Sequence, residues 1–159
     1  MKALWAPWRI DYILGEKEKE CIFCAIPAQK NDRNNLILHR GKTCYVIMNK
    51  YPYNNGHLMV VPYFHTSSFD GLSDEVLAEM NVLTRFCVDC LKKAFRPEGF
   101  NVGINIGKAA GAGIEEHLHA HIVPRWGGDA NFMASVGEVR IIVEHIMATY
   151  DKLYPIFSS

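Results

Sequence analysis

The chain has 159 residues, 49% of them hydrophobic, and its 17 basic residues balance 17 acidic ones. This length supports a single domain with its own hydrophobic core. The balanced charge argues against a nucleic acid polymer or an anionic membrane as the main partner, while a small charged ligand stays possible. No apolar run approaches the roughly 20 residues of a membrane-spanning helix, and residues 1–14 lack the apolar segment of a secretory signal, so we expect a cytoplasmic protein.

The first 20 residues are rich in aromatic side chains, with Trp5, Trp8 and Tyr12 close together. Such a segment gains stability by packing, so residues 1–20 are predicted to be an extension that lies on the domain or on a partner subunit. The domain itself is expected to cover residues 21–159.

The five cysteines fit reduced thiols or a metal site better than a disulfide framework. Cys21 and Cys24 are two residues apart, as in half of a tetrahedral zinc site. Cys87 and Cys90 repeat this spacing, which raises the alternative of a four-cysteine site. That alternative is the less favoured one, because these two cysteines fall in a strongly helical segment where Cys87 completes an apolar stripe.

Short runs rich in β-forming residues alternate with turn residues over much of the chain, and they predict antiparallel strands at residues 36–39, 43–48, 57–62, 99–106 and 117–124. Between them, Ser73 is a good N-cap for an amphipathic helix of about 20 residues that ends before Pro97. A second helical pattern begins near Val139 and stops before Pro155. This order predicts an α+β fold of one domain, with a five-stranded antiparallel sheet, one long helix and a C-terminal helix.

Three histidines alternate with apolar residues in His117-Leu118-His119-Ala120-His121-Ile122. On a strand this pattern places three imidazoles on one face, about 6.6 Å apart. They could bind a metal, or they could act as a nucleophile and phosphate ligands. The least favoured alternative is that the three histidines are hydrogen-bonded within the fold and have no function.

The glycine-rich run before the histidines favours phosphate chemistry that needs no divalent metal. Gly107, Gly111 and Gly113 allow successive backbone N–H groups to form an anion-binding nest, and Lys108 lies within the run. The run is not a P-loop, because no Gly-Lys-Ser/Thr follows it. A neutral imidazole whose Nδ1–H is held by a backbone carbonyl can attack the α-phosphorus of a nucleotide through Nε2, and the middle ring is the natural attacker.

The stretch from His117 to Val123 resembles the signature of the histidine triad family of nucleotide hydrolases and transferases. The likeness extends from Cys21-Ile22-Phe23-Cys24 through Asn55-Gly56-His57-Leu58-Met59-Val60-Val61-Pro62 to Arg125. The resemblance implies a HIT-like fold, a homodimer, and His119 as the nucleophile, with His57, His117 and His121 around the phosphates. It also implies ribose contacts by Asn49, for which capping a turn is the alternative, and phosphate or leaving-group contacts by Asn105.

In bacterial members with the two-cysteine knuckle the resemblance implies a structural zinc, here held by Cys21, Cys24, His65 and His117. It implies no organic cofactor. Trp126, together with Lys108, Gly111 and Gly113, is a further candidate for nucleotide or phosphate contacts.

One departure from the family pattern bears on the reaction. Hydrolase members carry Gly-Gln-Ser/Thr before the triad, whereas this chain has Gly113-Ile114-Glu115-Glu116, which is similar to the branch that contains diadenosine tetraphosphate phosphorylases. The expected function is therefore cleavage of dinucleoside polyphosphates at the α-phosphate through a nucleotidyl-His119 intermediate, with inorganic phosphate as co-substrate. The alternatives are a hydrolase of dinucleoside polyphosphates or nucleoside phosphoramidates, a catalytic zinc enzyme, and a nucleotide-binding regulatory module without turnover.

Overall fold

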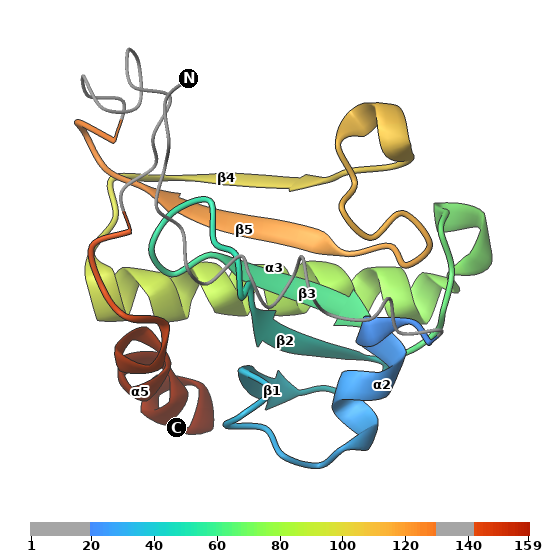
Figure 1. Cartoon of the computed structure of the whole chain (residues 1–159), viewed down its shortest axis with the longest axis horizontal. Helices are drawn as coiled ribbons and strands as arrows, with labels where there is room; N and C mark the ends of the chain where they lie inside the picture. Colours follow the sequence, from blue (N-terminus) through green and yellow to red (C-terminus); the bar gives the residue numbers. More distant parts are fainter. Residues whose placement is uncertain (1–19, 130–141) are drawn as a thin grey trace, which may run out of the picture.

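Five antiparallel strands form one sheet with the order β1-β2-β3-β5-β4 (Figure 1). The computed structural model describes residues 20–129 and 142–159, so the predicted extension lies outside the described residues except for Glu20. The strands are β1 (Ile37–Arg40), β2 (Cys44–Met48), β3 (Leu58–Pro62), β4 (Gly99–Ile104) and β5 (Ala120–Arg125). The sheet confirms the predicted α+β class.

The centre of the sheet is apolar on both faces. Every residue of β2 and β3 is buried, and Leu58 of β3 pairs with the fully buried Ile122 of β5. β4 lies at the edge, where its register places Val102 opposite Ile122. Both faces of β2 and β3 are therefore covered, and β4 has a partner only on its β5 side among the described residues.

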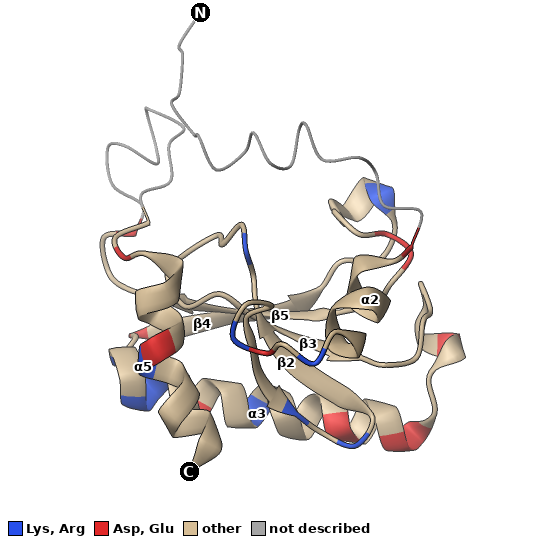
Figure 2. Ribbon diagram, turned by 60° about the horizontal axis from the view of Figure 1, so that its bottom comes forward, with Lys and Arg blue, Asp and Glu red and all other residues tan. Residues whose placement is uncertain are grey.

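Helix α3 (Asp74–Phe95) is the predicted long helix. The Ser73 side chain accepts a hydrogen bond from the Val76 N–H at 3.4 Å, and the helix ends at Arg96, whose φ of 49° breaks the helical path before Pro97. The helix packs along β2, β3 and β5, on the opposite side of the sheet from α2 (Ile22–Ala28) (Figure 2). Cys87 and Cys90 are buried in this packing face, as the apolar stripe predicts.

Two helices differ from the expectations. α2 was not predicted, because seven residues around a cysteine pair carry too little periodicity, and it begins where the Cys21 carbonyl accepts hydrogen bonds from the next turn. α5 (Ile146–Ser158) begins later than predicted, since His145 caps it by accepting a bond from the Met147 N–H at 3.3 Å. It also continues through Pro155, where burial of the neighbouring Leu153 and Phe157 outweighs one lost backbone hydrogen bond.

Neither α3 nor any other helix in the described ranges combines the length and the apolar character that a bilayer crossing requires.

Candidate active site and metal cluster

The triad histidines do not form the predicted row on one strand. β5 begins only at Ala120, so His117 and His119 lie in the irregular segment before it, where the Leu118 N–H donates to the Thr66 carbonyl at 2.7 Å rather than to a neighbouring strand. The rings of His119 and His121 meet edge to face, with centroids 4.7 Å apart and planes at 72°. The predicted strand therefore began three residues too early, and the imidazoles point in different directions.

A hydrogen bond to the His117 carbonyl holds His119 in one tautomer. Its Nδ1 lies 2.7 Å from the His117 carbonyl oxygen, which can only accept, so Nδ1 carries the proton and Nε2 keeps its lone pair. The side chain is buried, and this burial lowers the pKa of His119. A neutral imidazole with a free Nε2 lone pair is the form that a nitrogen nucleophile needs.

The tautomer of His121 is set by a chain of hydrogen bonds through His57. The Tyr53 N–H donates to His57 Nδ1 at 3.1 Å, so His57 carries its proton on Nε2. This Nε2 lies 2.9 Å from His121 Nδ1 and donates to it, which leaves the proton of His121 on its own Nε2. Burial, with a smaller contribution from His119, lowers the pKa of His121 to about 4. The two neutral rings therefore present opposite functions, a lone pair on His119 and an N–H on His121.

The loop before His57 contributes to the site through residues that carry no motif. The ring of Tyr53 lies over both histidines, with centroids 4.6 Å from His57 and 5.6 Å from His121. The Asn49 amide nitrogen lies 3.4 Å from His57 Nδ1, and its Oδ1 accepts a bond from the Tyr51 N–H at 2.8 Å. Asn49 thus shapes this loop, in the turn-capping role that was the alternative to a ribose contact.

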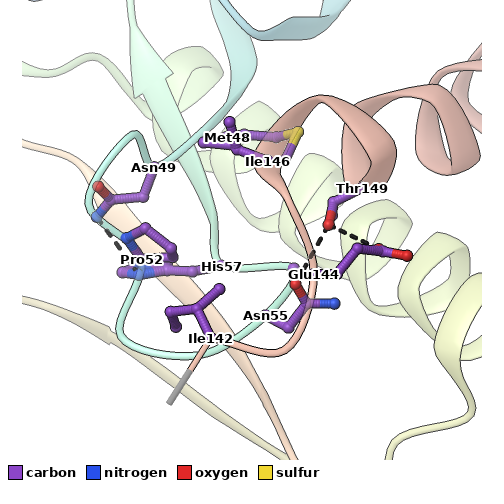
Figure 3. Close-up of a pocket in the computed structure, with 10 residues that line it drawn as sticks. Met48, Asn49, Pro52, Asn55, His57, Ile142, Glu144, Ile146 and Thr149 are labelled. Atoms are coloured by element: carbon purple, nitrogen blue, oxygen red, sulfur yellow. Dashed lines mark hydrogen bonds between the residues drawn. The ribbon is translucent and has the colours of Figure 1, made fainter. Parts of the chain in front are cut away.

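A cavity of about 20 Å³, the size of one water molecule, lies behind His57 between this loop and the start of α5 (Figure 3). At its wall the Thr149 Oγ1 lies 2.8 Å from Glu144 Oε2 and 3.2 Å from Asn55 Oδ1, and these two acceptors share its one proton. These bonds join α5 to the loop two residues before His57. The sequence gives no signal for them, since an isolated Thr on a helix has no characteristic partner.

The glycine run folds as a turn around a short 3-10 helix, η3 (Lys108–Ala110). Gly107 and Gly111 have φ values of 78° and 81°, which side chains disfavour, while Gly113 has no such constraint. The N–H groups of Ala110 and Gly111 bond within the turn, to the carbonyls of Gly107 and Lys108. Two amides of the predicted nest are therefore already paired.

The other residues predicted to contact the nucleotide are more exposed than the histidines. Asn105 is half-buried just after β4, which ends at Ile104 rather than at the predicted Ile106, and Lys108 is exposed. Trp126 is half-buried, and its backbone N–H donates to Asp129 Oδ2 at 2.9 Å.

Cys21, Cys24, His65 and His117 form a cluster whose ligand atoms all lie within 4.8 Å of one another. His117 Nδ1 is 3.2 Å from Cys21 Sγ and 3.3 Å from His65 Nδ1. The Nε2 of His117 donates to the Pro62 carbonyl at 2.8 Å, so Nδ1 carries the lone pair that a metal requires. Cys87 and Cys90 lie in the core of α3 and do not belong to this cluster.

The electrostatics of the cluster fit a cation. Burial and the neighbouring Cys21 thiol raise the pKa of Cys24, because a second thiolate at this place is unfavourable without a compensating positive charge. Two sulfur and two nitrogen donors are the set that a tetrahedral zinc ion prefers. The four residues can therefore bind a metal ion of this kind.

A family model described as HIT domain matches residues 30–128, which is more than half of the chain. An AP-4-A phosphorylase from Mycobacterium tuberculosis is 41% identical over 157 residues, a match that covers 94% of this chain and 80% of that protein. A crystal structure of a Zn-bound histidine triad family protein from Mycobacterium smegmatis has a TM-score of 0.71 and 25% identity, covering 87% of this chain and 94% of that one.

A histidine triad nucleotide-binding protein from Sulfolobus tokodaii has a TM-score of 0.68 and 28% identity, covering 86% of this chain and 89% of that one. Together with the histidine geometry and the matching family model, these similarities show that the chain belongs to the HIT domain family.

Proposed function

We propose that the protein is a nucleotide-cleaving enzyme that acts at the α-phosphate of dinucleoside polyphosphates of the diadenosine tetraphosphate kind, and that inorganic phosphate completes the reaction. The observation that carries this proposal is the tautomer of His119, whose Nδ1–H is bonded to the His117 carbonyl and whose Nε2 is therefore nucleophilic. The 41% identity to an AP-4-A phosphorylase over most of both chains supports the same reaction.

In the first step, His119 Nε2 attacks the α-phosphorus, a P–N bond forms, and the P–O bond to the departing nucleoside polyphosphate breaks. The Nε2–H of His121 can donate a hydrogen bond to a phosphoryl oxygen or to the leaving oxygen, and so stabilise the negative charge that grows there. His57 keeps this proton on Nε2 by occupying His121 Nδ1.

In the second step, an oxygen of inorganic phosphate attacks the phosphorus of nucleotidyl-His119. The P–N bond breaks, a nucleoside diphosphate leaves, and the lone pair returns to His119 Nε2. Attack by water at the same phosphorus would instead give a nucleoside monophosphate, so the products identify the acceptor. The Ile114-Glu115-Glu116 sequence, which replaces the Gln-Ser/Thr of the hydrolases, supports phosphate as the acceptor.

We further propose that Asn49 and Trp126 contact the nucleoside and that Asn105, Lys108, Gly111 and Gly113 contact the phosphates. Lys108 is exposed and offers a flexible positive charge to the polyphosphate chain. The amides of Gly111 and Ala110 are paired within the turn, so Gly111 would contribute through the close approach that its missing side chain allows.

We propose zinc as the metal of the cluster, held by Cys21, Cys24, His65 and His117. The Zn-bound relative from Mycobacterium smegmatis supports this choice. Zinc held by these four residues would cross-link them and would take no part in the reaction, because a set of four protein ligands leaves no position for substrate or water. The residues it joins belong to α2, the segment after β3 and the segment before β5.

We also propose a homodimer that forms along β4. A groove of about 320 Å³ runs between β4 and α3, with apolar walls that include Leu77, Met80 and Ile104. At its rim Val102 is 52% exposed and Phe69 is 41% exposed, and the outer edge of β4 has no partner strand among residues 20–129 and 142–159. A second copy placed against the groove would bury these side chains.

The test of the reaction measures the nucleotides released from diadenosine tetraphosphate with and without inorganic phosphate. Wild type is expected to release ADP in a phosphate-dependent manner, and His119→Ala is expected to lose turnover by about 10³-fold or more. Turnover that is equally fast without phosphate and yields AMP would leave only the hydrolase alternative. Unchanged turnover in His119→Ala would refute the nucleophile, and tight nucleotide binding without any product would favour a regulatory module.

A further inference from the structure

Phe23 lies at the junction between the metal cluster and the proposed nucleophile. It stands between Cys21 and Cys24 on α2 and is 3% exposed. Its ring centroid is 4.9 Å from that of His119, with the planes at 57°, and 5.5 Å from that of His117, which it meets edge-on. A single aromatic side chain thus contacts both a ligand of the cluster and the nucleophile.

The position of Phe23 is set by contacts other than those with His119. Its carbonyl oxygen accepts a hydrogen bond from the Tyr45 hydroxyl at 2.8 Å, and Tyr45 is fully buried in β2. On either side of it, the sulfur atoms of Cys21 and Cys24 lie 3.2 and 3.6 Å from His117 Nδ1. The backbone that carries the ring is therefore held by the sheet, and the ring itself packs on His117 of the cluster.

His119 depends on such a support, because within the described residues its imidazole makes one hydrogen bond, from Nδ1–H to the His117 carbonyl. One hydrogen bond defines a direction but leaves the ring free to rock about it. Phe23 closes one side of the ring and His121 closes another, with centroids 4.7 Å apart. If Phe23 were smaller, the ring could swing toward the vacated space and Nε2 would move with it.

We propose that Phe23 is a positioning residue, which holds the His119 imidazole so that Nε2 faces the α-phosphorus and which couples the Cys21–Cys24 pair to the geometry of the nucleophile. The inference rests on the proposed function in one respect, the assignment of His119 as the nucleophile. A displacement of about 1 Å in a reacting group can cost about 10²-fold in rate, so a packing contact of this kind has a measurable effect.

The test compares Phe23→Leu and Phe23→Ala with Phe157→Leu and Phe157→Ala in the full-length, zinc-loaded protein. Phe157 is a matched control, since it is 4% exposed and its ring also packs edge-on, with a centroid 5.0 Å from that of Phe86. We expect single-turnover formation of nucleotidyl-His119 to fall about 10-fold in Phe23→Leu and about 100-fold in Phe23→Ala, with KM changed less than about 3-fold. The Phe157 variants should lose thermal stability but stay within about 2-fold of wild type in rate at a temperature where they are folded.

A second measurement follows the His119 ring without any substrate. Nitrogen-15 NMR of the imidazoles at pH 8 is expected to show one Nδ1–H tautomer for His119 in wild type and in the Phe157 variants. Both tautomers, or an exchange-broadened signal, are expected in the Phe23 variants and in wild type from which zinc has been removed by a chelator. If Phe23→Ala does not fold, Phe23→Leu carries both measurements.

A normal rate and a single His119 tautomer in the Phe23 variants would overturn the proposal. So would a change in KM alone, because Phe23 would then act on the substrate rather than on His119. If wild type cleaves no dinucleoside polyphosphate but the tautomer follows the Phe23 substitutions, the proposed function fails and the positioning role stands.

Discussion

Replacing Thr149 by valine removes the hydroxyl that joins α5 to the loop before His57. Thr149 is 1% exposed, and its one hydroxyl proton is shared between Glu144 Oε2 at 2.8 Å and Asn55 Oδ1 at 3.2 Å (Figure 3). Valine has nearly the same shape, so the substitution deletes these bonds without leaving a cavity. The Asn55 side chain, which is 8% exposed, then has one polar partner fewer inside the protein.

A hydrogen bond to a charged acceptor contributes about 1.5–3 kcal/mol, and a buried polar group that loses a partner costs about 1–3 kcal/mol. These overlapping terms give a decrease of about 2 kcal/mol in the free energy of unfolding of Thr149→Val. For a chain of this size, that decrease corresponds to a Tm about 4–8 °C lower. Because Asn55 lies two residues before His57, we also expect the turnover of diadenosine tetraphosphate to fall by about 3- to 10-fold.

Urea and thermal unfolding monitored by circular dichroism measure the change, with Thr84→Val as the control. Thr84 Oγ1 donates to the Met80 carbonyl at 2.7 Å within α3, and that carbonyl also accepts the regular helical bond, so the control should lose less than about 0.5 kcal/mol. An equal loss in both variants, or a loss below about 0.5 kcal/mol in Thr149→Val, would refute the reasoning.

Three further predictions concern protonation, metal and assembly. Because burial lowers the pKa of His121 to about 4, the unfolded chain binds more protons than the folded one between about pH 6.5 and pH 4, so stability is lost as the pH falls through this window. Between pH 7 and pH 4 the free energy of unfolding, measured with urea, should fall by about 3 kcal/mol more in wild type than in His121→Asn. An equal fall in both proteins would contradict the lowered pKa of His121. A chelator should lower the Tm of wild type and of Cys90→Ala but leave Cys21→Ser unchanged in calorimetry, and an equal response in Cys21→Ser would exclude it as a ligand. Val102→Lys should convert the proposed homodimer to a monomer in light scattering, whereas Val82→Lys, which is equally exposed but does not line the groove, should leave it a dimer. A dimer in both variants would place the interface elsewhere.

The elements with strong local signals were predictable from the sequence. Ser73 caps α3 as expected, and the apolar stripe that contains Cys87 is the buried face of that helix. The predicted boundaries of α5 and the predicted start of β5 were wrong, because the capping by His145 and the hydrogen bond from the His119 side chain to the His117 carbonyl have no periodic signature. Helix ends and strand ends depend on such single contacts, whereas element type depends on many residues.

The sequence by itself determined which chemical groups the proposed site contains, since the spacing of its histidines and cysteines supplies imidazole nitrogens and thiol sulfurs. The tertiary structure decided which nitrogen of each imidazole carries the proton and which keeps its lone pair. Cys21 reaches His117 across 96 residues, and the proton positions on His119 and His121 follow from the His117 carbonyl and the Tyr53 amide. Such contacts depend on the relative orientation of backbone groups from distant segments, which a local pattern does not specify. The contact of Phe23 with His119 arises in the same way, because an aromatic ring can pack in any apolar site and only the fold selects one.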